Sequence, residues 1–66
     1  MNEHRISVFQ PVGDAASELL RIIPGLGHGD AVVVLRSAEA NGRSILDNGA
    51  EVIYDRNDYG WIVRPA

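Results

Sequence analysis

The sequence predicts an α+β fold, a two-layer sandwich in the order β-α-β-α-β-β with both helices on one face of a small mixed sheet. Three observations support this: a helical apolar pattern over residues 14–23, a β-branched run at residues 31–35, and two strand-like segments around a turn near the end of the chain. The 66 residues contain no cysteine. We therefore expect one domain, residues 1–66, with a thin core and no disulfides.

The first strand and the first helix follow from the pattern at the start of the chain. In residues 5–9, RISVF, the aliphatic side chains alternate with polar ones, which predicts a strand that ends before Pro11. Asp14 is a suitable N-cap, and Pro24 with Gly25 ends the helix that follows. One face of this helix is apolar, with a spacing of i, i+3, i+4 and i+7 at Ala16, Leu19, Leu20 and Ile23.

The middle of the chain contains a second predicted strand and an ambiguous segment. Residues 31–35, AVVVL, are apolar on both faces and predict a central strand, parallel to the first through a right-handed crossover. In residues 37–49, Asn41 can cap a short helix over 42–48 that ends at Gly49, or the Asn-Gly pair can be a hairpin turn. The short helix is favoured because two adjacent apolar residues, at 45 and 46, do not alternate as in a half-buried strand.

The last part of the chain predicts a hairpin. Residues 51–56 and 61–65 flank the turn sequence NDYG, with Arg56 opposite Trp61. This pairing places Val52, Tyr54, Trp61 and Val63 on the core face. Ile53 and Ile62 then lie among charges on the other face, either as scattered surface residues or as a dimer or partner contact.

The glycine-rich stretch PGLGHGD, residues 24–30, resembles a phosphate loop only in composition. A dinucleotide loop follows a strand and opens a helix, whereas this loop is predicted to follow a helix and open a strand, with the anion Asp30 close by and no lysine in the chain. We therefore expect a structural joint, with the role of His28 left open. His4 and His28 lack metal-ligand spacing, and no catalytic constellation is recognisable. We expect a protein that is not an enzyme and has no cofactor.

Charge constrains the partner class. Nine acidic residues and six arginines give a net charge of −3. A negative chain repels a phosphate backbone, so direct nucleic-acid binding is not expected, and a protein partner with a basic surface is favoured. Alternatively, the acidity only keeps a small protein in solution. No apolar run is long enough to span a membrane, and we expect a cytoplasmic monomer or weak homodimer.

These observations together predict a small acidic, non-catalytic binding protein. Its specific form is a phage or mobile-element inhibitor of the anti-CRISPR kind that masks a basic nucleic-acid-binding surface. Tyr59, at a turn tip among carboxylates, is a candidate hot spot. The predicted partner-binding residues are Glu51, Ile53, Asp55, Asp58, Tyr59 and Ile62.

A family resemblance implies an alternative. The Gln10-Pro11 pair before the first helix, Gly29-Asp30 before AVVVL, and the ending ILDNGAEVIYDRNDYGWIVR resemble the small sulfur-carrier proteins and their cysteine-free relatives. The resemblance implies their fold. It does not imply their activity, because Gln10 stands where the carriers have the cysteine that sulfur relay requires. The alternative function is therefore a degenerate carrier-like accessory domain that docks on an enzyme.

Overall fold

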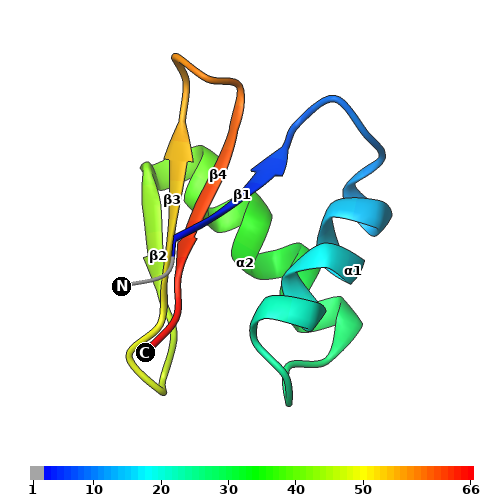
Figure 1. Cartoon of the computed structure of the whole chain (residues 1–66), viewed down its shortest axis with the longest axis vertical. Coiled ribbons are helices and arrows are strands. Elements are labelled where there is room, and N and C mark those ends of the chain that lie inside the picture. Colours follow the sequence, from blue (N-terminus) through cyan, green and yellow to red (C-terminus); the bar gives the residue numbers. More distant parts are fainter. Residues whose placement is uncertain (1–2) are drawn as a thin grey trace.

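The computed structural model describes residues 3–66 and has two layers, a helix pair packed on one face of a four-stranded antiparallel sheet (Figure 1). The predicted α+β class and two-layer architecture are confirmed. The elements are β1 (His4–Ser7), α1 (Val12–Ile22), α2 (His28–Asn41), β2 (Arg43–Ile45), β3 (Glu51–Asp55) and β4 (Gly60–Arg64). The predicted element order and the predicted mixed sheet are wrong, because the helices follow one another and all strand pairs are antiparallel.

The sheet has the strand order β1-β4-β3-β2, so the last strand lies in the interior of the sheet and pairs with the first. In the β3–β4 hairpin, Tyr54 lies opposite Trp61 and Ile53 opposite Ile62. The predicted register, with Arg56 opposite Trp61, is wrong by two residues. The predicted faces are nevertheless correct, because side chains alternate with a period of two and a shift of two preserves them.

Helix α1 covers residues 12–22, where 14–23 were predicted. Pro11 occupies the N-cap position and Asp14 lies in the first turn, so the predicted Asp14 cap is wrong. Proline suits this helix start because its missing N–H would have had no partner inside the helix. The predicted apolar stripe is correct in placing Ala16, Leu19 and Ile23 in the core.

The predicted strand at residues 31–35 is wrong, because this segment forms the middle of α2. Its buried residues are Ala31, Leu35 and Ala38, spaced i, i+4 and i+7, which is one face of a helix. The surrounding valines favour strands only weakly, and tertiary contacts override such preferences. Helix α2 contains the small residues that let it approach α1 closely, and this packing determines the conformation of the segment.

The predicted short helix over residues 42–48 is also wrong, and a hairpin takes its place. Asn41-Gly42 is not its turn: α2 ends there, and Gly42 adopts the left-handed conformation with a φ of 90°. The hairpin joins β2 to β3 through a turn at residues 46–49, where the Leu46 N–H donates to the Ala50 carbonyl at 2.8 Å. Gly49, which was predicted to end a helix, has a φ of 91° in this turn.

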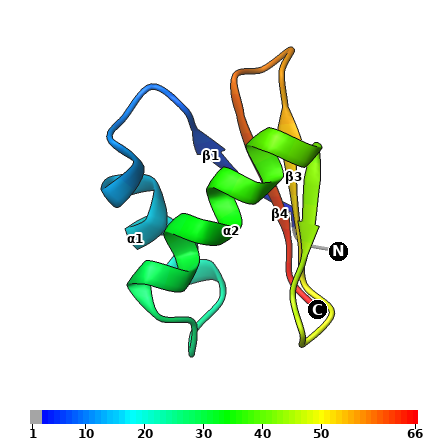
Figure 2. The ribbon, with the colours of Figure 1, turned by 180° about the vertical axis from the view of Figure 1, so that it is seen from behind.

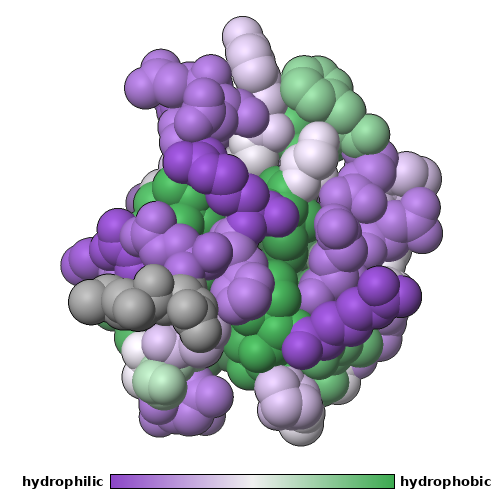
Figure 3. Space-filling view, in the orientation of Figure 1, coloured by the Kyte–Doolittle hydropathy of each residue, from purple (hydrophilic) through white to green (hydrophobic). Residues whose placement is uncertain are grey.

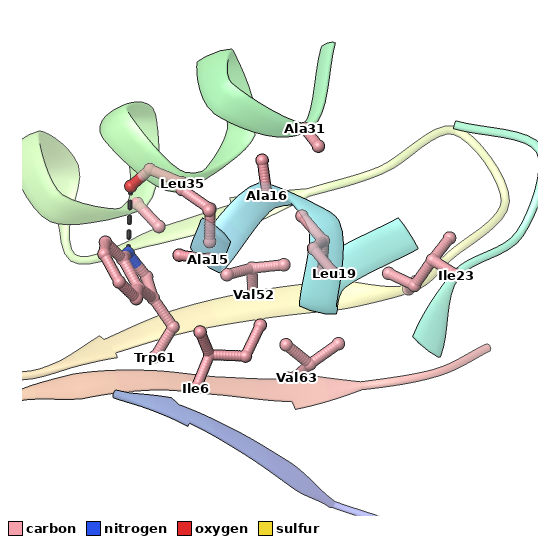
Figure 4. Packing of buried hydrophobic residues seen from close by; sticks show 12 residues of the cluster. Ile6, Ala15, Ala16, Leu19, Ile23, Ala31, Leu35, Val52, Trp61 and Val63 are labelled. Carbon is pink, nitrogen blue, oxygen red and sulfur yellow. Dashed lines mark hydrogen bonds between the residues drawn. The ribbon is translucent and has the colours of Figure 1, made fainter. Parts of the chain in front are cut away.

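The core lies between the two layers, with Trp61 at one side of the cluster (Figure 4). The indole Nε1 donates a buried hydrogen bond to the Leu35 carbonyl in α2, at 3.0 Å. Alanines at the helix contact keep the two helices close, and aliphatic side chains from the sheet complete the core. The buried hydrophobic residues are Ile6, Ala15, Ala16, Leu19, Ile23, Ala31, Leu35, Ala38, Ala50, Val52, Trp61 and Val63.

The two ends of the molecule carry different loops. The β1–α1 loop and the β3–β4 turn lie at one end, and the α1–α2 loop and the β2–β3 turn lie at the opposite end, in both views (Figures 1 and 2). Figure 3 shows hydrophilic surface over the sheet and over α1, with an apolar seam between them and a separate apolar patch over the β1–α1 loop.

Candidate protein-binding surface

The tip of the β3–β4 hairpin holds Tyr59 in an uncommon conformation. Tyr59 is the non-glycine residue with a positive φ, 51°, among residues 3–66. A left-handed conformation costs roughly 1–2 kcal/mol for a residue with a Cβ atom. The turn itself is well supported, because the Asp55 carboxylate accepts the Asn57 N–H and the Tyr59 carbonyl accepts the Val8 N–H, both at 3.0 Å. The predicted hot-spot residue is therefore presented by a rigid turn.

Tyr59 contacts a second exposed aromatic residue that the sequence did not identify. Phe9, in the β1–α1 loop, lies with its ring centroid 5.6 Å from that of Tyr59, and the rings are tilted by 47°. Their exposed fractions are 78% for Phe9 and 57% for Tyr59. The available signal was the alternation in residues 5–9, where Phe9 shares the polar positions of Arg5 and Ser7. The structure thus brings together an aromatic pair, which we call the aromatic tip.

The predicted binding carboxylates are engaged by arginines from neighbouring strands. Asp58 accepts a hydrogen bond from Arg5 at 3.0 Å, and Asp55 lies 3.7 Å from the same guanidinium group. Glu51 lies between Arg43 at 3.2 Å and Arg64 at 3.7 Å. The predicted acidic surface is therefore internally compensated, and a basic partner would have to compete with these arginines for the same carboxylates.

Ile53 and Ile62 lie on the open face of the sheet, as predicted, but they lie side by side only because the register differs from the predicted one. They are directly opposite one another in the β3–β4 ladder and are half-buried. Arg43 lies opposite Ile53, and Arg5 lies opposite Ile62, so charged residues border the apolar pair on both sides. Among the six predicted partner-binding residues, Glu51, Ile53, Asp55 and Ile62 lie on this open face. Asp58 and Tyr59 lie in the β3–β4 turn, where Tyr59 belongs to the aromatic tip and Asp58 pairs with Arg5.

Gln10 has a structural role at the start of α1. Its Nε2 donates to the Ser7 carbonyl at 2.8 Å and to the Glu18 carboxylate at 2.6 Å, which links the end of β1 to the helix. The element order expected from the sulfur-carrier resemblance is not the order found. Gly29-Asp30, for example, opens a helix and not a strand.

The glycine-rich loop joins α1 to α2, so its predicted role as a structural joint is correct in part, but it opens a helix. The Asp30 carboxylate lies in the first turn of α2, where it interacts favourably with the helix dipole and repels a phosphate. The ring Nε2 of His28 lies 3.1 Å from the Gly13 carbonyl and, as a donor, connects the first turns of the two helices. His28, whose role was left open, thus has a packing role.

The described residues show neither a candidate metal centre nor a membrane span. Within residues 3–66, no three histidine, cysteine or acidic side chains are grouped so that they could hold a metal ion. In the same part of the chain, no helix has the length and apolar character needed to cross a membrane.

Comparisons with protein-family models, with curated proteins and with solved structures find no match to this chain.

Proposed function

We propose that this protein is a non-catalytic binding domain that docks on a protein partner through its aromatic tip. The contact between Phe9 and Tyr59 carries the proposal, because two large rings from distant parts of the sequence are held together at the surface. Exposed aromatic residues on rigid supports are typical of binding hot spots, since they contribute contact area at a low entropic cost. Backbone strain at Tyr59 supports the same conclusion, because such strain concentrates at functional sites.

The open face of the sheet extends the proposed contact. Ile53 and Ile62 offer a small apolar centre beside the tip, bordered by the ion pairs of Glu51, Asp55 and Asp58. Exposed ion pairs contribute about 0–1 kcal/mol each, so a partner can exchange them for its own at little net cost. In this proposal the aromatic tip supplies affinity, and the charged border selects the orientation of the partner.

The specific form of the proposal is an inhibitor that acts in the cytoplasm and covers a basic, nucleic-acid-binding surface, as an anti-CRISPR protein does. The net charge of −3 supports a basic partner, because it speeds encounter with a positive surface and disfavours direct binding to nucleic acid. The ion pairs on the open face change the expected mechanism. Steering comes from the net charge of the whole domain, and the complex is held by the aromatic tip.

A comparative pull-down from a host lysate tests the proposal. The wild-type domain is compared with a Phe9→Ser/Tyr59→Asn double variant, in which the aromatic tip is removed and residue 59 can still adopt a positive φ. Ala40→Ser is the control, because it changes an exposed side chain of α2 without altering the charge and leaves the aromatic tip intact. We expect one protein to be retained by the wild type and the control and to be lost with the double variant.

Two results would contradict the proposal. One is retention of the same partner by the double variant in amounts equal to the wild type. The other is that no protein is retained by the wild type in excess over a blank matrix. Repeating the retention step across a salt series tests the electrostatic part separately, because a basic partner should bind more weakly as salt rises.

A further inference from the structure

A groove is lined by residues of the α1–α2 loop, α2 and the β2–β3 turn. The α1–α2 loop and the β2–β3 turn lie at the end of the molecule opposite the aromatic tip (Figure 2). It has a volume of about 530 Å³. Its walls are mainly aliphatic, with Ile23, Leu26, Val33, Val34, Ile45 and Leu46. Val33 is 62% exposed and Ile45 is 63% exposed, so apolar side chains on both sides of the groove are open to water. Such a concave apolar surface is suited to taking apolar side chains from a ligand.

The charges at the groove are acidic and uncompensated. Asp30 and Asp47 line it, both are exposed, and neither forms an ion pair with an arginine in the part of the chain the structure describes. None of the lining residues is basic. The carboxylates on the open face of the sheet, in contrast, are paired with arginines. The groove therefore has a negative character that the predicted acidic surface lacks.

The groove also borders the free edge of the sheet. Strand β2 pairs with β3 through Ser44 opposite Val52. On either side of this pair, the Gly42 carbonyl accepts the Tyr54 N–H at 2.9 Å and the Leu46 N–H donates to the Ala50 carbonyl at 2.8 Å. Backbone groups alternate in direction along an antiparallel strand, so those of Arg43 and Ile45 are directed away from β3. An edge of this kind is a template for an added strand.

Helix α2 carries a residue at the groove that folding does not require. Val33 is exposed, and valine has a lower helix propensity than alanine because its χ1 freedom is restricted in a helix. The same helix buries its alanines and Leu35 against the rest of the core. An exposed β-branched residue beside an apolar groove is consistent with a contact to another chain.

We propose that the groove and the β2 edge form a second docking site, which takes an extended segment of a partner protein that carries apolar and basic residues on one face. The segment adds to β2 as a strand, so that its backbone bonds to Arg43 and Ile45. Residues at alternate positions of a strand share one face, so the apolar side chains of that face enter the groove against Val33 and its basic side chains approach Asp30 and Asp47. The apolar walls, the acidic rim and the unpaired edge each match one property of this occupant.

The experiment titrates the isotope-labelled domain with an acetylated, amidated heptapeptide that has serine at every second position and valine and lysine at the others, and follows the amide signals by NMR. We expect saturable shifts concentrated in residues 30–34 and 43–48. An Asp30→Asn/Asp47→Asn variant should bind about fivefold more weakly at low salt, since exposed charge pairs contribute modestly. Val33→Ala should bind about threefold more weakly and keep its thermal stability, because alanine is the better helix former.

Two further peptides test the strand geometry. Each carries N-methyl groups on alternate residues, one peptide on the odd set and the other on the even set. An added strand uses only one set of amides toward β2, so one methylated peptide should lose at least tenfold in affinity and the other should not. A matched peptide with glutamate in place of each lysine should bind more weakly than the lysine peptide.

Several results would overturn the inference. They are equal binding by the glutamate peptide, equal binding by both methylated peptides and the parent, and shifts that cluster around Phe9 and Tyr59. Shifts at the β2 edge that depend on the concentration of the domain and not on the peptide would assign the edge to a second copy of this chain. Because the two sites lie at opposite ends, equal retention of the lysate partner by the wild type and the Phe9→Ser/Tyr59→Asn variant, together with saturable peptide binding, refutes only the aromatic-tip proposal.

Discussion

Gly60 is the position where the fold tolerates a side chain least. Strands β1 and β4 lie so close together there that a Cβ atom on Gly60 would overlap the Ile6 carbonyl oxygen. The same Cβ atom would lie 3.3 Å from the Ile6 carbonyl carbon. These are backbone atoms, so no rotamer change can relieve the contact. We expect Gly60→Ala to push β1 away from β4.

The cost follows from what β1 contributes. Separation at this point weakens the β1–β4 ladder, including the hydrogen bond from the Val8 N–H to the Tyr59 carbonyl, and each such bond contributes about 1 kcal/mol. Ile6 is only 1% exposed, and full burial of such a side chain contributes about 1.5–3 kcal/mol. A partial loss of both gives roughly 2–4 kcal/mol, which is most of the 3–5 kcal/mol available to a domain of this size.

Thermal unfolding followed by circular dichroism measures this effect. A change of 1 kcal/mol shifts the Tm of a small domain by about 4–8 °C, so Gly60→Ala should lower the Tm by at least about 10 °C. Gly29→Ala is the matched control: a Cβ there meets no atom within 4 Å, and alanine favours the helix by about 0.5–1 kcal/mol. A Gly60→Ala protein with an unchanged Tm would refute the argument that β1 and β4 are in backbone contact.

Three further changes test other parts of the structure. Trp61→Phe removes the buried hydrogen bond to the Leu35 carbonyl and part of the core volume, and should cost about 1.5–3 kcal/mol in urea unfolding; a smaller loss would show that the indole is dispensable. Tyr59→Asn should change the free energy of unfolding by less than about 0.5 kcal/mol. Tyr59→Val should cost about 1 kcal/mol more than Tyr59→Asn, because β-branched residues disfavour a positive φ. Equal stability of the two variants would contradict the strained turn. Glu51→Gln should cost about 0.5–1 kcal/mol at low salt and less in 1 M NaCl, and a salt-independent loss would exclude an ion-pair origin.

The sequence was sufficient for elements whose local pattern agrees with their packing. Helix α1 has one clear apolar face between Pro11 and Pro24, and the β3–β4 hairpin alternates cleanly around its turn. The middle of the chain was misassigned because three consecutive valines carry no helical period. The informative signal was the helical spacing of Ala31, Leu35 and Ala38. These residues form the buried face of α2 only because the helix packs against α1 and the sheet.

The binding residues show the same division between local and long-range information. Tyr59 could be predicted, since a turn sequence identifies an exposed tip. Its contact with Phe9 and the pairing of Asp58 with Arg5 could not, because both depend on β1 lying beside β4, more than fifty residues away in the chain. The groove depends in turn on α2 being a helix. The groove could therefore not be predicted while residues 31–35 were assigned to a strand.

The place of β4 in the sheet has a consequence for how the chain reaches its native state. Strand β4 is synthesised after the other five elements described here, yet it lies between β1 and β3. Before it emerges from the ribosome, β1 has no strand to pair with and Trp61 cannot seal the core against α2. The two helices can associate early, but the sheet closes only through contacts between the two ends of the chain, which are slow to form. Folding therefore completes after synthesis of β4, and a nascent chain halted before this strand exposes an unpaired β1 that other chains can capture.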